Sequence, residues 1–215
     1  PMCLQCSITA IGSVILQWAV NVLGSTAVAA VTAAGKTSNL LSVPLESLGT
    51  AMATYAGQNL GAARLDRVRS GVRYALGITV VYAVLALVLL HFFDVAIIGM
   101  FIDTGAEVEV VRLARSYLFW NGLFFLPLGA LIVWRYVIQG LGYSSIAMLA
   151  GVAEMVARTG VALVLVPGLG FFGASLANPA AWVAACIFLL PAYTWTMRHI
   201  ANRLQANRLR MEQPA

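Results

Sequence analysis

Apolar residues dominate six long stretches of this chain, and short polar segments separate them. Each stretch has roughly twenty residues, which as an α-helix spans about 30 Å, the thickness of the hydrocarbon core of a bilayer. The predicted membrane-spanning helices cover residues 2–23, 37–57, 72–93, 115–138, 145–166 and 173–196. The pattern therefore predicts an all-α, polytopic membrane protein, with a six-helix transmembrane bundle over 1–197 and a basic tail over 198–215.

The composition supports lipid as the solvent around these helices. Hydrophobic residues make up 61% of the 215-residue chain, charged residues make up 10%, and the mean hydropathy is +0.88. Soluble domains have about 25% charged residues, so the excess apolar surface is expected to face acyl chains. The chain begins at Pro1 without an initiator Met, a basic n-region or a cleavage site. We therefore expect a segment of a longer protein rather than a signal peptide at this end.

The basic residues predict the orientation of the bundle, and the net charge is +5. One basic group follows the second predicted span and another follows the sixth: Arg64, Arg67, Arg69 and Arg73, then Arg198, Arg203, Arg208 and Arg210. The loop on the opposite side is acidic, with Asp94, Asp103, Glu107 and Glu109. Cytoplasmic loops carry the excess of Lys and Arg, so both ends are expected in the cytoplasm of a multi-pass protein of the cell (inner) membrane. Basic residues placed beside spans also argue against nucleic acid as a partner.

A polar stripe runs along the first predicted span. Its members are spaced four residues apart: Gln5, Thr9, Ser13, Gln17 and Asn21. Four residues turn an α-helix through about 400°, so the stripe stays near one face. Polar groups on a lipid face would leave their hydrogen bonds unmade. We expect the stripe to line a water-filled cleft, and the alternative is hydrogen bonding between neighbouring helices.

Three charged residues lie deep inside the predicted spans. Glu154 and Arg158 are four residues apart on the fifth span, so they can form an ion pair on one face. Glu46 on the second span lies at a similar depth, which predicts a cluster of two acids and one base. One carboxylate would then lack a counter-charge, and a proton or Na⁺ could neutralise it. These residues are our candidates for cation coupling or the substrate path. The alternative is an ion pair that only fixes helix packing.

An arginine, a cysteine pair and two histidines are not expected to form part of a functional site. Arg135 lies three residues from the cytoplasmic end of the fourth predicted span, where its side chain is expected to reach the headgroups. Cys3 and Cys6 have the C-x-x-C spacing, but no second ligand pair completes a zinc site, so neither a metal nor a cofactor is expected. His91 and His199 lie near span ends. Because no cluster of His, Asp or Glu lies at one interface, an enzyme such as a membrane-embedded transferase is not expected.

Five segments resemble the C-terminal half of the MATE (multidrug and toxic compound extrusion) family. In chain order they resemble parts of the family's seventh, eighth, tenth, eleventh and twelfth helices: Pro1–Gln5, Leu48–Ala62, Arg135–Gly142, Gly151–Arg158 and Gly173–Trp182. The resemblance implies one lobe of a two-lobe transporter whose N-terminal lobe is missing from this chain. It further implies a cation-coupled multidrug efflux antiporter that exports organic, in particular cationic, compounds by alternating access. A lipid or polysaccharide-precursor flippase of the same superfamily is the alternative.

The chain departs from one branch of this family. In the NorM branch, acids on the first and fourth helices of this half help to bind sodium, whereas Pro1–Gly24 and Arg115–Gln139 contain no Asp or Glu. The sodium site of the NorM branch is therefore not expected in this chain. The coupling ion is expected to be H⁺ or Na⁺, and the coupling acid is Glu46 or Glu154, or lies in the missing half, as in the DinF-like branch. We favour the missing half.

Overall fold

The computed structural model describes the backbone of residues 2–99 and 108–212, and the side chains of 7–93, 96–99 and 108–206. Helices account for all regular structure in these residues: α1 (Met2–Val22), α2 (Ser25–Gly61), α3 (Leu65–Gly99), α4 (Val108–Leu123), α5 (Phe125–Gly140), α6 (Ser144–Gly160), the π-helical turn η1 (Val161–Leu165), α7 (Val166–Leu169) and α8 (Phe171–Glu212). The predicted all-α class is confirmed.

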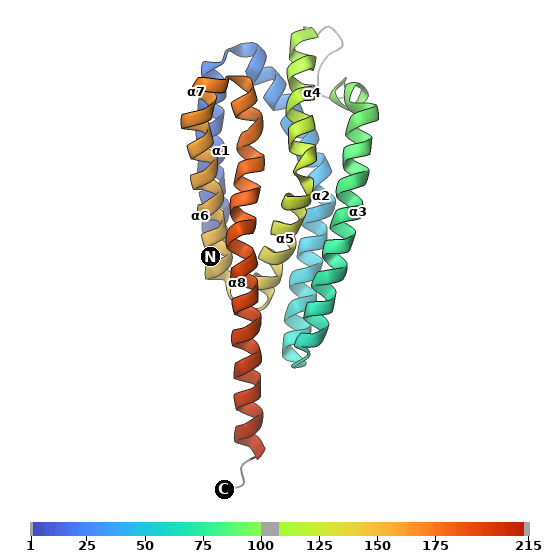
Figure 1. Ribbon diagram of the computed structural model, residues 1–215, viewed down its shortest axis with the longest axis vertical. Coiled ribbons are helices and arrows are strands. Elements are labelled where there is room, and N and C mark those ends of the chain that lie inside the picture. The colour runs from blue at the N-terminus through green and yellow to red at the C-terminus, as the bar shows by residue number, and fades with distance from the viewer. Residues whose placement is uncertain (1, 100–107, 213–215) are drawn as a thin grey trace.

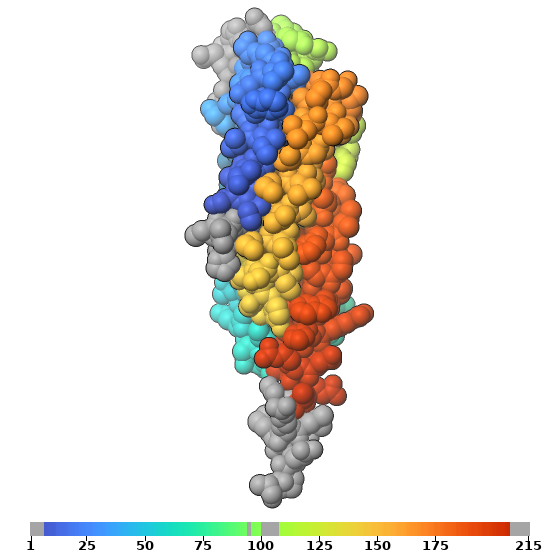
Figure 2. All heavy atoms as spheres, turned by 90° about the vertical axis from the view of Figure 1, so that its left-hand side faces the viewer, coloured from blue at the N-terminus to red at the C-terminus, as the bar shows by residue number. Residues whose placement is uncertain are grey.

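The helices form an elongated bundle with two sides (Figure 1). On one side α1 packs along α6, which Figure 2 shows as neighbouring blue and yellow ridges. On the other side α2 packs against α3, α4 and α5, and α8 contacts both groups. α1 and α2 share the turn at Gly24 but make few contacts with each other beyond it. This divergence leaves room for a pocket between α1 and α2.

Three turns between helices each contain a glycine with positive φ. Gly24 (φ 98°) separates α1 from α2, Gly142 (φ 92°) separates α5 from α6, and Gly170 (φ 58°) separates α7 from α8. Residues with a Cβ rarely adopt this left-handed region, which explains why glycine punctuates the chain at these points.

Several helices differ from the predicted spans. α3 (Leu65–Gly99) extends beyond 72–93, and α8 (Phe171–Glu212) extends beyond 173–196. The second predicted span begins at 37, but α2 begins at Ser25 and continues without interruption through Pro44 to Gly61. The fourth predicted span, 115–138, falls on two helices, α4 and α5, which meet at an angle of 50° around Phe124. Small deviations of this kind leave the order of the predicted elements unchanged.

Length and composition allow several described helices to cross a bilayer. Three helical segments are long and apolar enough to cross a membrane: Leu65–Phe93, Ser144–Leu169 and Phe171–Ala206. The bent α4–α5 pair makes a fourth if it counts as one span. The described part of α1, Ser7–Val22, is apolar but shorter. The number of spans and their orientation stay predictions, since helix length alone does not place a membrane.

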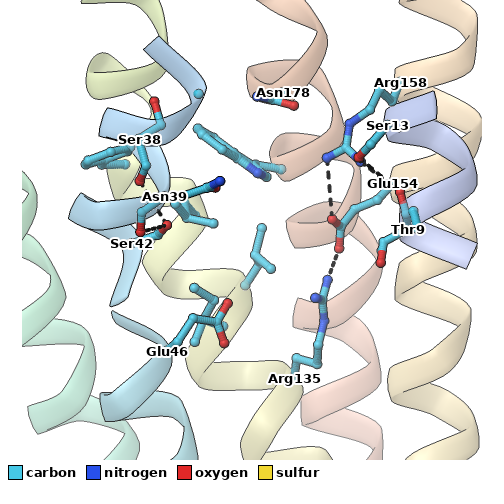
Figure 3. A pocket seen from close by; sticks show the side chains of 17 residues that line it. Thr9, Ser13, Ser38, Asn39, Ser42, Glu46, Arg135, Glu154, Arg158 and Asn178 are labelled. Atoms are coloured by element: carbon cyan, nitrogen blue, oxygen red, sulfur yellow. Dashed lines mark hydrogen bonds and ion pairs between the residues drawn. The ribbon is translucent and has the colours of Figure 1, made fainter. Parts of the chain in front are cut away.

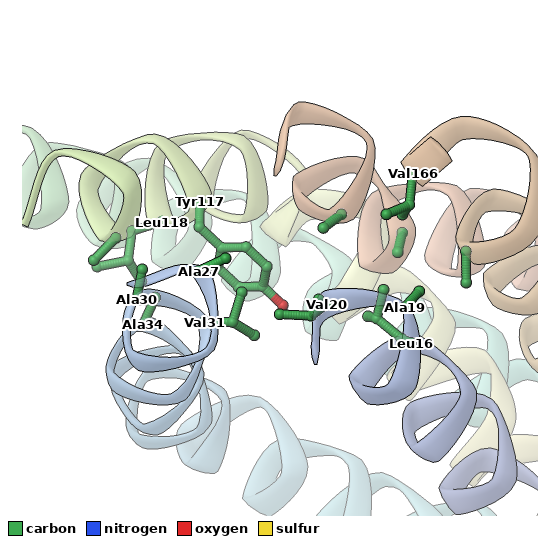
Figure 4. Close-up of a cluster of buried hydrophobic side chains, with 14 of the residues drawn as sticks. Leu16, Ala19, Val20, Ala27, Ala30, Val31, Ala34, Tyr117, Leu118 and Val166 are labelled. Atoms are coloured by element: carbon green, nitrogen blue, oxygen red, sulfur yellow. The ribbon is translucent and has the colours of Figure 1, made fainter. Parts of the chain in front are cut away.

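Small residues let the helices approach closely. One buried cluster, shown in Figure 4, contains Ala19 of α1 and Ala27, Ala30 and Ala34 of α2, around Tyr117 of α4. Close approach through small side chains is the usual way in which helices pack inside membranes. The outer surface of α3 carries large exposed apolar residues: Ile78, Val80, Val81, Val84, Leu85, Val88 and Leu89. A surface of this kind suits acyl chains.

Candidate functional site

The pocket between α1 and α2 has a volume of about 470 Å³. Its walls come from α1, α2, α5, α6 and α8, and polar groups line much of it (Figure 3). Pockets for small organic ligands commonly measure about 300–1,000 Å³, so this one has room for such a molecule. Four charged residues lie in its walls: Glu46, Arg135, Glu154 and Arg158.

Glu154 lies between two arginines. Its Oε1 atom forms an ion pair with Arg135 of α5, and its Oε2 atom lies 4.0 Å from Nη2 of Arg158 on the same helix. All three side chains are buried, with exposed fractions of 6% for Glu154, 11% for Arg135 and 8% for Arg158. The predicted pairing of Glu154 with Arg158 is therefore present as a loose contact, while the close partner of Glu154 is Arg135.

Arg158 also ties α6 to α1. Its Nη1 atom donates hydrogen bonds to the carbonyl oxygen of Thr9 (3.3 Å) and to Oγ of Ser13 (3.2 Å). A Cβ added at Gly12 would lie 3.2 Å from Cα of Met155, so glycine lets α1 come close enough for these bonds. The middle of the predicted polar stripe thus contacts the buried charges directly.

Glu46 lies on the opposite wall, on α2. The sequence predicted a cluster of Glu46 with Arg158, and the structure does not form that contact. The hydroxyl group of Tyr136 donates a hydrogen bond of 2.8 Å to Oε2 of Glu46, and the Glu46 residue is exposed. Figure 3 places the Glu46 carboxylate across the pocket from the Arg158 guanidinium group. The structure brings Glu46, Glu154 and Arg158 to one pocket, but not into one ion-pair cluster.

The prediction for Arg135 is wrong. Its side chain does not extend to the headgroups; it is buried and paired with Glu154. The charge balance changes as a result, because two acids now share the pocket with two bases rather than with one. The formal charges of the pocket therefore balance, although Glu46 itself contacts the Tyr136 hydroxyl group rather than a base.

The polar stripe of α1 divides into parts. Thr9 and Ser13 line the pocket, and Ser13 Oγ donates a hydrogen bond to the Thr9 carbonyl oxygen at 3.2 Å. Gln17 and Asn21 are exposed, and Nε2 of Gln17 donates to Oδ1 of Asn21 at 3.1 Å. The side chain of Gln5 lies outside the described residues. The role of the stripe in lining a cleft stays a prediction.

Sequence reasoning missed several polar residues of the site. Asn178 of α8 lines the pocket, and its Nδ2 atom donates to the Tyr117 hydroxyl (3.0 Å) and to Oδ1 of Asn121 (3.1 Å), which joins α8 to α4. Ser38 and Ser42 of α2 also line the pocket, on the same wall as Glu46. Their four-residue spacing, Ser38–Ser42–Glu46, repeats that of the first stripe and was a usable signal.

The described groups outside the pocket form no cluster of metal-ligand side chains. Among the described residues, no three His, Cys, Asp or Glu side chains lie together as ligands. Cys3 and Cys6 have no described side chains. His199 stacks on Trp195, with ring centroids 5.0 Å apart and an interplanar angle of 13°, and His91 is exposed.

The basic group between α2 and α3 contains one local ion pair. Nη2 of Arg64 lies 3.0 Å from Oδ2 of Asp66, and hydrogen bonding to this guanidinium group lowers the pKa of the Asp66 carboxyl below its usual value. Both side chains are at least half exposed to solvent, so the pair contributes little to stability. Among the described residues, no ion pair is formed by Arg67, Arg69 or Arg73 at this end.

An apolar helical bundle with a buried charged pocket is typical of one lobe of a membrane transporter. Residues 1–164 match the MatE family model, which covers most of the chain. The chain therefore belongs to the MatE family, and the family predicted from the five segments is confirmed.

Solved structures share the fold of this chain. A MOP superfamily transporter from Pyrococcus furiosus, described with a binding pocket of reverse polarity, has a TM-score of 0.79 at 21% identity, over 88% of this chain and 42% of that chain. A multidrug resistance MATE family transporter in an outward-facing conformation gives the same values. An inward-facing structure gives a TM-score of 0.75 at 20% identity, over 87% of this chain and 44% of that chain.

A curated relative matches over a shorter region. The Probable multidrug resistance protein YoeA of Bacillus subtilis (strain 168) is 24% identical over 106 residues, which is 49% of this chain and 23% of that protein. This chain thus spans less than half the length of the proteins it matches, as expected for one lobe of two.

Proposed function

We propose that this chain forms the C-terminal half of a cation-coupled multidrug efflux antiporter. The complete protein exports organic compounds, in particular cationic ones, by alternating access between two lobes. Family membership supports this proposal, and so do the structural neighbours, which include outward-facing and inward-facing MATE transporters. The second lobe covers the open side of the pocket between α1 and α2.

The single observation that carries the proposal is the pocket with ionisable groups inside an apolar bundle. A charge at the centre of a bilayer costs about 2.5–3.5 kcal/mol on insertion scales, so intramembrane charges usually serve a pathway. Glu46 is the group open to a ligand, because it is exposed to the pocket and its described hydrogen-bond partner is the neutral Tyr136 hydroxyl. Its carboxylate attracts the positive charge of an organic cation.

The coupling ion is H⁺ or Na⁺. Arg135 neutralises Glu154 in the structure, so Glu154 has no need of a bound cation. Glu46 remains the candidate coupling acid of this half. The balanced charges of the pocket favour our expectation that the main coupling acid belongs to the other lobe. The protein resides in the cell membrane with both ends cytoplasmic.

Transport by the full-length gene product in proteoliposomes tests this proposal. An imposed proton or sodium gradient is expected to drive vectorial movement of the cationic dye ethidium. Glu46→Gln is expected to reduce gradient-driven movement at least ~10-fold, as for loss of an essential charge contact of about 1.4 kcal/mol or more. The matched control is Glu109→Gln, since Glu109 pairs with Arg112 and lies outside the pocket. Unchanged coupled transport by a folded Glu46→Gln protein would remove Glu46 from the mechanism.

A second candidate function is a flippase for lipids or polysaccharide precursors. The burial of Arg135 beside Arg158 favours it, because guanidinium groups are well suited to binding phosphate. Proteoliposomes that contain a fluorescent phospholipid separate the two candidates. Lipid movement across the bilayer without ethidium transport supports the flippase, and the opposite result supports the antiporter.

A further inference from the structure

A groove between α3 and α4 is separate from the pocket described above. Its volume is about 720 Å³, its lining residues fall within 87–92 of α3 and 112–123 of α4, and none of them lines the pocket between α1 and α2. Figure 1 shows α3 on the opposite side of the bundle from α1, and this part of α3 and α4 at the end opposite the C-terminus of α8. The α3–α4 groove is therefore on the back of the lobe, at the end predicted to face away from the cytoplasm.

The deeper part of the α3–α4 groove is apolar. Leu90 and Leu118 are buried beneath it, while Phe119 and Leu123 line it as exposed side chains. At about 1.5 Å per residue, Leu123 lies about 12 Å along α4 from Arg115. An exposed apolar surface of this length on a membrane helix suits part of an acyl chain.

The other end of the α3–α4 groove is basic. Its lining includes His91, Arg112 and Arg115, and no Asp or Glu. His91 lies two residues from the end of the segment Leu65–Phe93, which is long and apolar enough to cross a membrane, so these side chains are at headgroup depth. The two arginines are three residues apart, which places them on one face of α4.

Arg112 has donors to spare for an anion. Its Nε and Nη2 atoms donate to the carboxylate of Glu109 at 2.9 Å and 2.6 Å. A guanidinium group has five N–H donors, so among the hydrogen bonds of the described residues its Nη1 atom keeps two of them. Guanidinium donors form a planar fork that matches the oxygens of a phosphate group.

This polarity selects the occupant. A soluble anion would use the arginines and leave the apolar part of the groove uncovered, whereas an apolar helix would cover that part and desolvate the guanidinium groups. The lining offers no carboxylate to an ammonium or choline group, because Glu109 lies outside it and is bonded to Arg112. An amphiphile with a net negative headgroup complements both parts of the groove.

We propose that the α3–α4 groove binds an anionic phospholipid of the surrounding membrane. Its phosphate group contacts Arg112 and Arg115, and one acyl chain lies along Leu118, Phe119 and Leu123. The bound lipid fills the groove between α3 and α4 on the back of the lobe. The site does not depend on which compound the protein transports.

Photoactivatable lipids test the proposal. The full-length gene product is placed in phosphatidylcholine nanodiscs with a trace of phosphatidylglycerol or phosphatidylcholine that carries a diazirine on the same acyl chain. Labelled residues are mapped by mass spectrometry and normalised to Val80 and Val84, exposed residues of α3 outside the groove. We expect phosphatidylglycerol to label residues 112–123 at least ~5-fold more than phosphatidylcholine, since basic side chains at the membrane surface attract anionic lipids. Equal labelling overturns the proposal, because the groove would then hold ordinary bilayer lipid.

Charge variants assign the preference to the two arginines. Arg112→Gln combined with Arg115→Gln is expected to abolish the preference for phosphatidylglycerol and to keep labelling by phosphatidylcholine. Replacement of both by lysine keeps the charges and the preference, which separates loss of charge from misfolding. The matched control Arg67→Gln with Arg69→Gln removes two exposed guanidinium groups at the other end of the bundle and is expected to change nothing. A preference that survives the double Gln variant at 112 and 115 overturns the assignment.

A filling variant tests the position of the acyl chain. Val88→Trp places a large side chain in the groove at an exposed position, so labelling of residues 112–123 by both lipids is expected to be lost. Val84→Trp, one turn away and outside the groove, is the control. Unchanged labelling in Val88→Trp overturns the placement of the chain. If neither lipid labels the groove of the parent protein, a second copy or another helix covers it, and the lipid site is rejected.

Discussion

The carboxylate of Glu154 connects two guanidinium groups that belong to different helices. Arg135 reaches it from α5, and Arg158 approaches it from the next turn of α6. Each charge is buried, so each depends on the others to offset the loss of hydration. Removal of the acid leaves two buried positive charges with no carboxylate in contact, which is more costly than removal of either base.

Glu154→Gln is therefore expected to destabilise the protein strongly. Breaking a buried ion pair from one side typically costs about 3–5 kcal/mol, because the remaining charge is uncompensated. The measurement is unfolding of the purified protein by sodium dodecyl sulfate, with Glu109→Gln as the control at an exposed pair. The double variant Arg135→Met with Glu154→Leu is expected to regain part of the loss. Equal stability of Glu154→Gln and the parent protein would mean that the pair is not formed.

The sequence predicts half of this arrangement. The i, i+4 spacing of Glu154 and Arg158 places both on one face of a helix whatever the rest of the fold does. The position of Arg135 could not be predicted in the same way, because depth counted from a helix end says nothing of direction. Whether an arginine turns toward headgroups or toward a partner depends on the rotation of α5 against α6, which linear position does not contain.

Helices α2 and α5 cross with their backbones in contact. A Cβ added at Gly140 would clash with the carbonyl oxygen of Ala53, and one added at Gly57 would lie 3.3 Å from the Gly140 carbonyl oxygen. Glycine at this crossing places the two helix axes close together, as small residues do in membrane bundles. The close approach positions Tyr136 of α5 to reach Glu46 of α2.

Gly140→Ala is expected to destabilise the protein by about 1–3 kcal/mol, because the new methyl group forces the backbones of α2 and α5 apart. The control is Gly77→Ala on α3, where no atom lies within 4 Å of the added Cβ. There the higher helix propensity of alanine stabilises by up to about 1 kcal/mol. The apparent melting temperature in detergent measures both. A melting temperature of Gly140→Ala at or above that of the parent protein contradicts this crossing geometry.

Element boundaries were predictable where glycine ends a helix and not where a helix turns a polar face inward. Gly24, Gly142 and Gly170 mark real turns. The predicted span begins at 37, directly after Lys36, whereas α2 runs through Lys36 without a break. The structure places Ser38, inside the predicted span, along the pocket. Hydropathy averaged along a sequence cannot distinguish a wet interior face from the edge of a membrane.

The whole molecule has one basic end. Figure 1 shows the α2–α3 turn and the C-terminal part of α8 at the same end of the bundle, with the α1–α2 and α7–α8 turns at the other. The basic residues at this shared end are Arg64, Arg67, Arg69 and Arg73, together with Arg198 and Arg203. Charge placement of this kind predicts that this end is cytoplasmic.

Cysteine labelling in intact cells measures the orientation. With Cys3, Cys6 and Cys186 replaced by alanine, Leu169→Cys is expected to react with a membrane-impermeant maleimide. Ala62→Cys and Asn202→Cys are expected to react only after the cells are permeabilised. All three parent residues are exposed at helix ends or on the projecting part of α8. Labelling of Ala62→Cys in intact cells would reverse the predicted orientation.

The equal numbers of acids and bases around the pocket have an electrical consequence. Glu46, Glu154, Arg135 and Arg158 sum to zero formal charge, so a movement that displaces all four equally along the membrane field transfers no net charge. One elementary charge moved through 100 mV is worth about 2.3 kcal/mol. A bound organic cation adds one charge to this sum, whereas a neutral molecule adds none. For this lobe, the cargo therefore decides whether the membrane potential favours or opposes export.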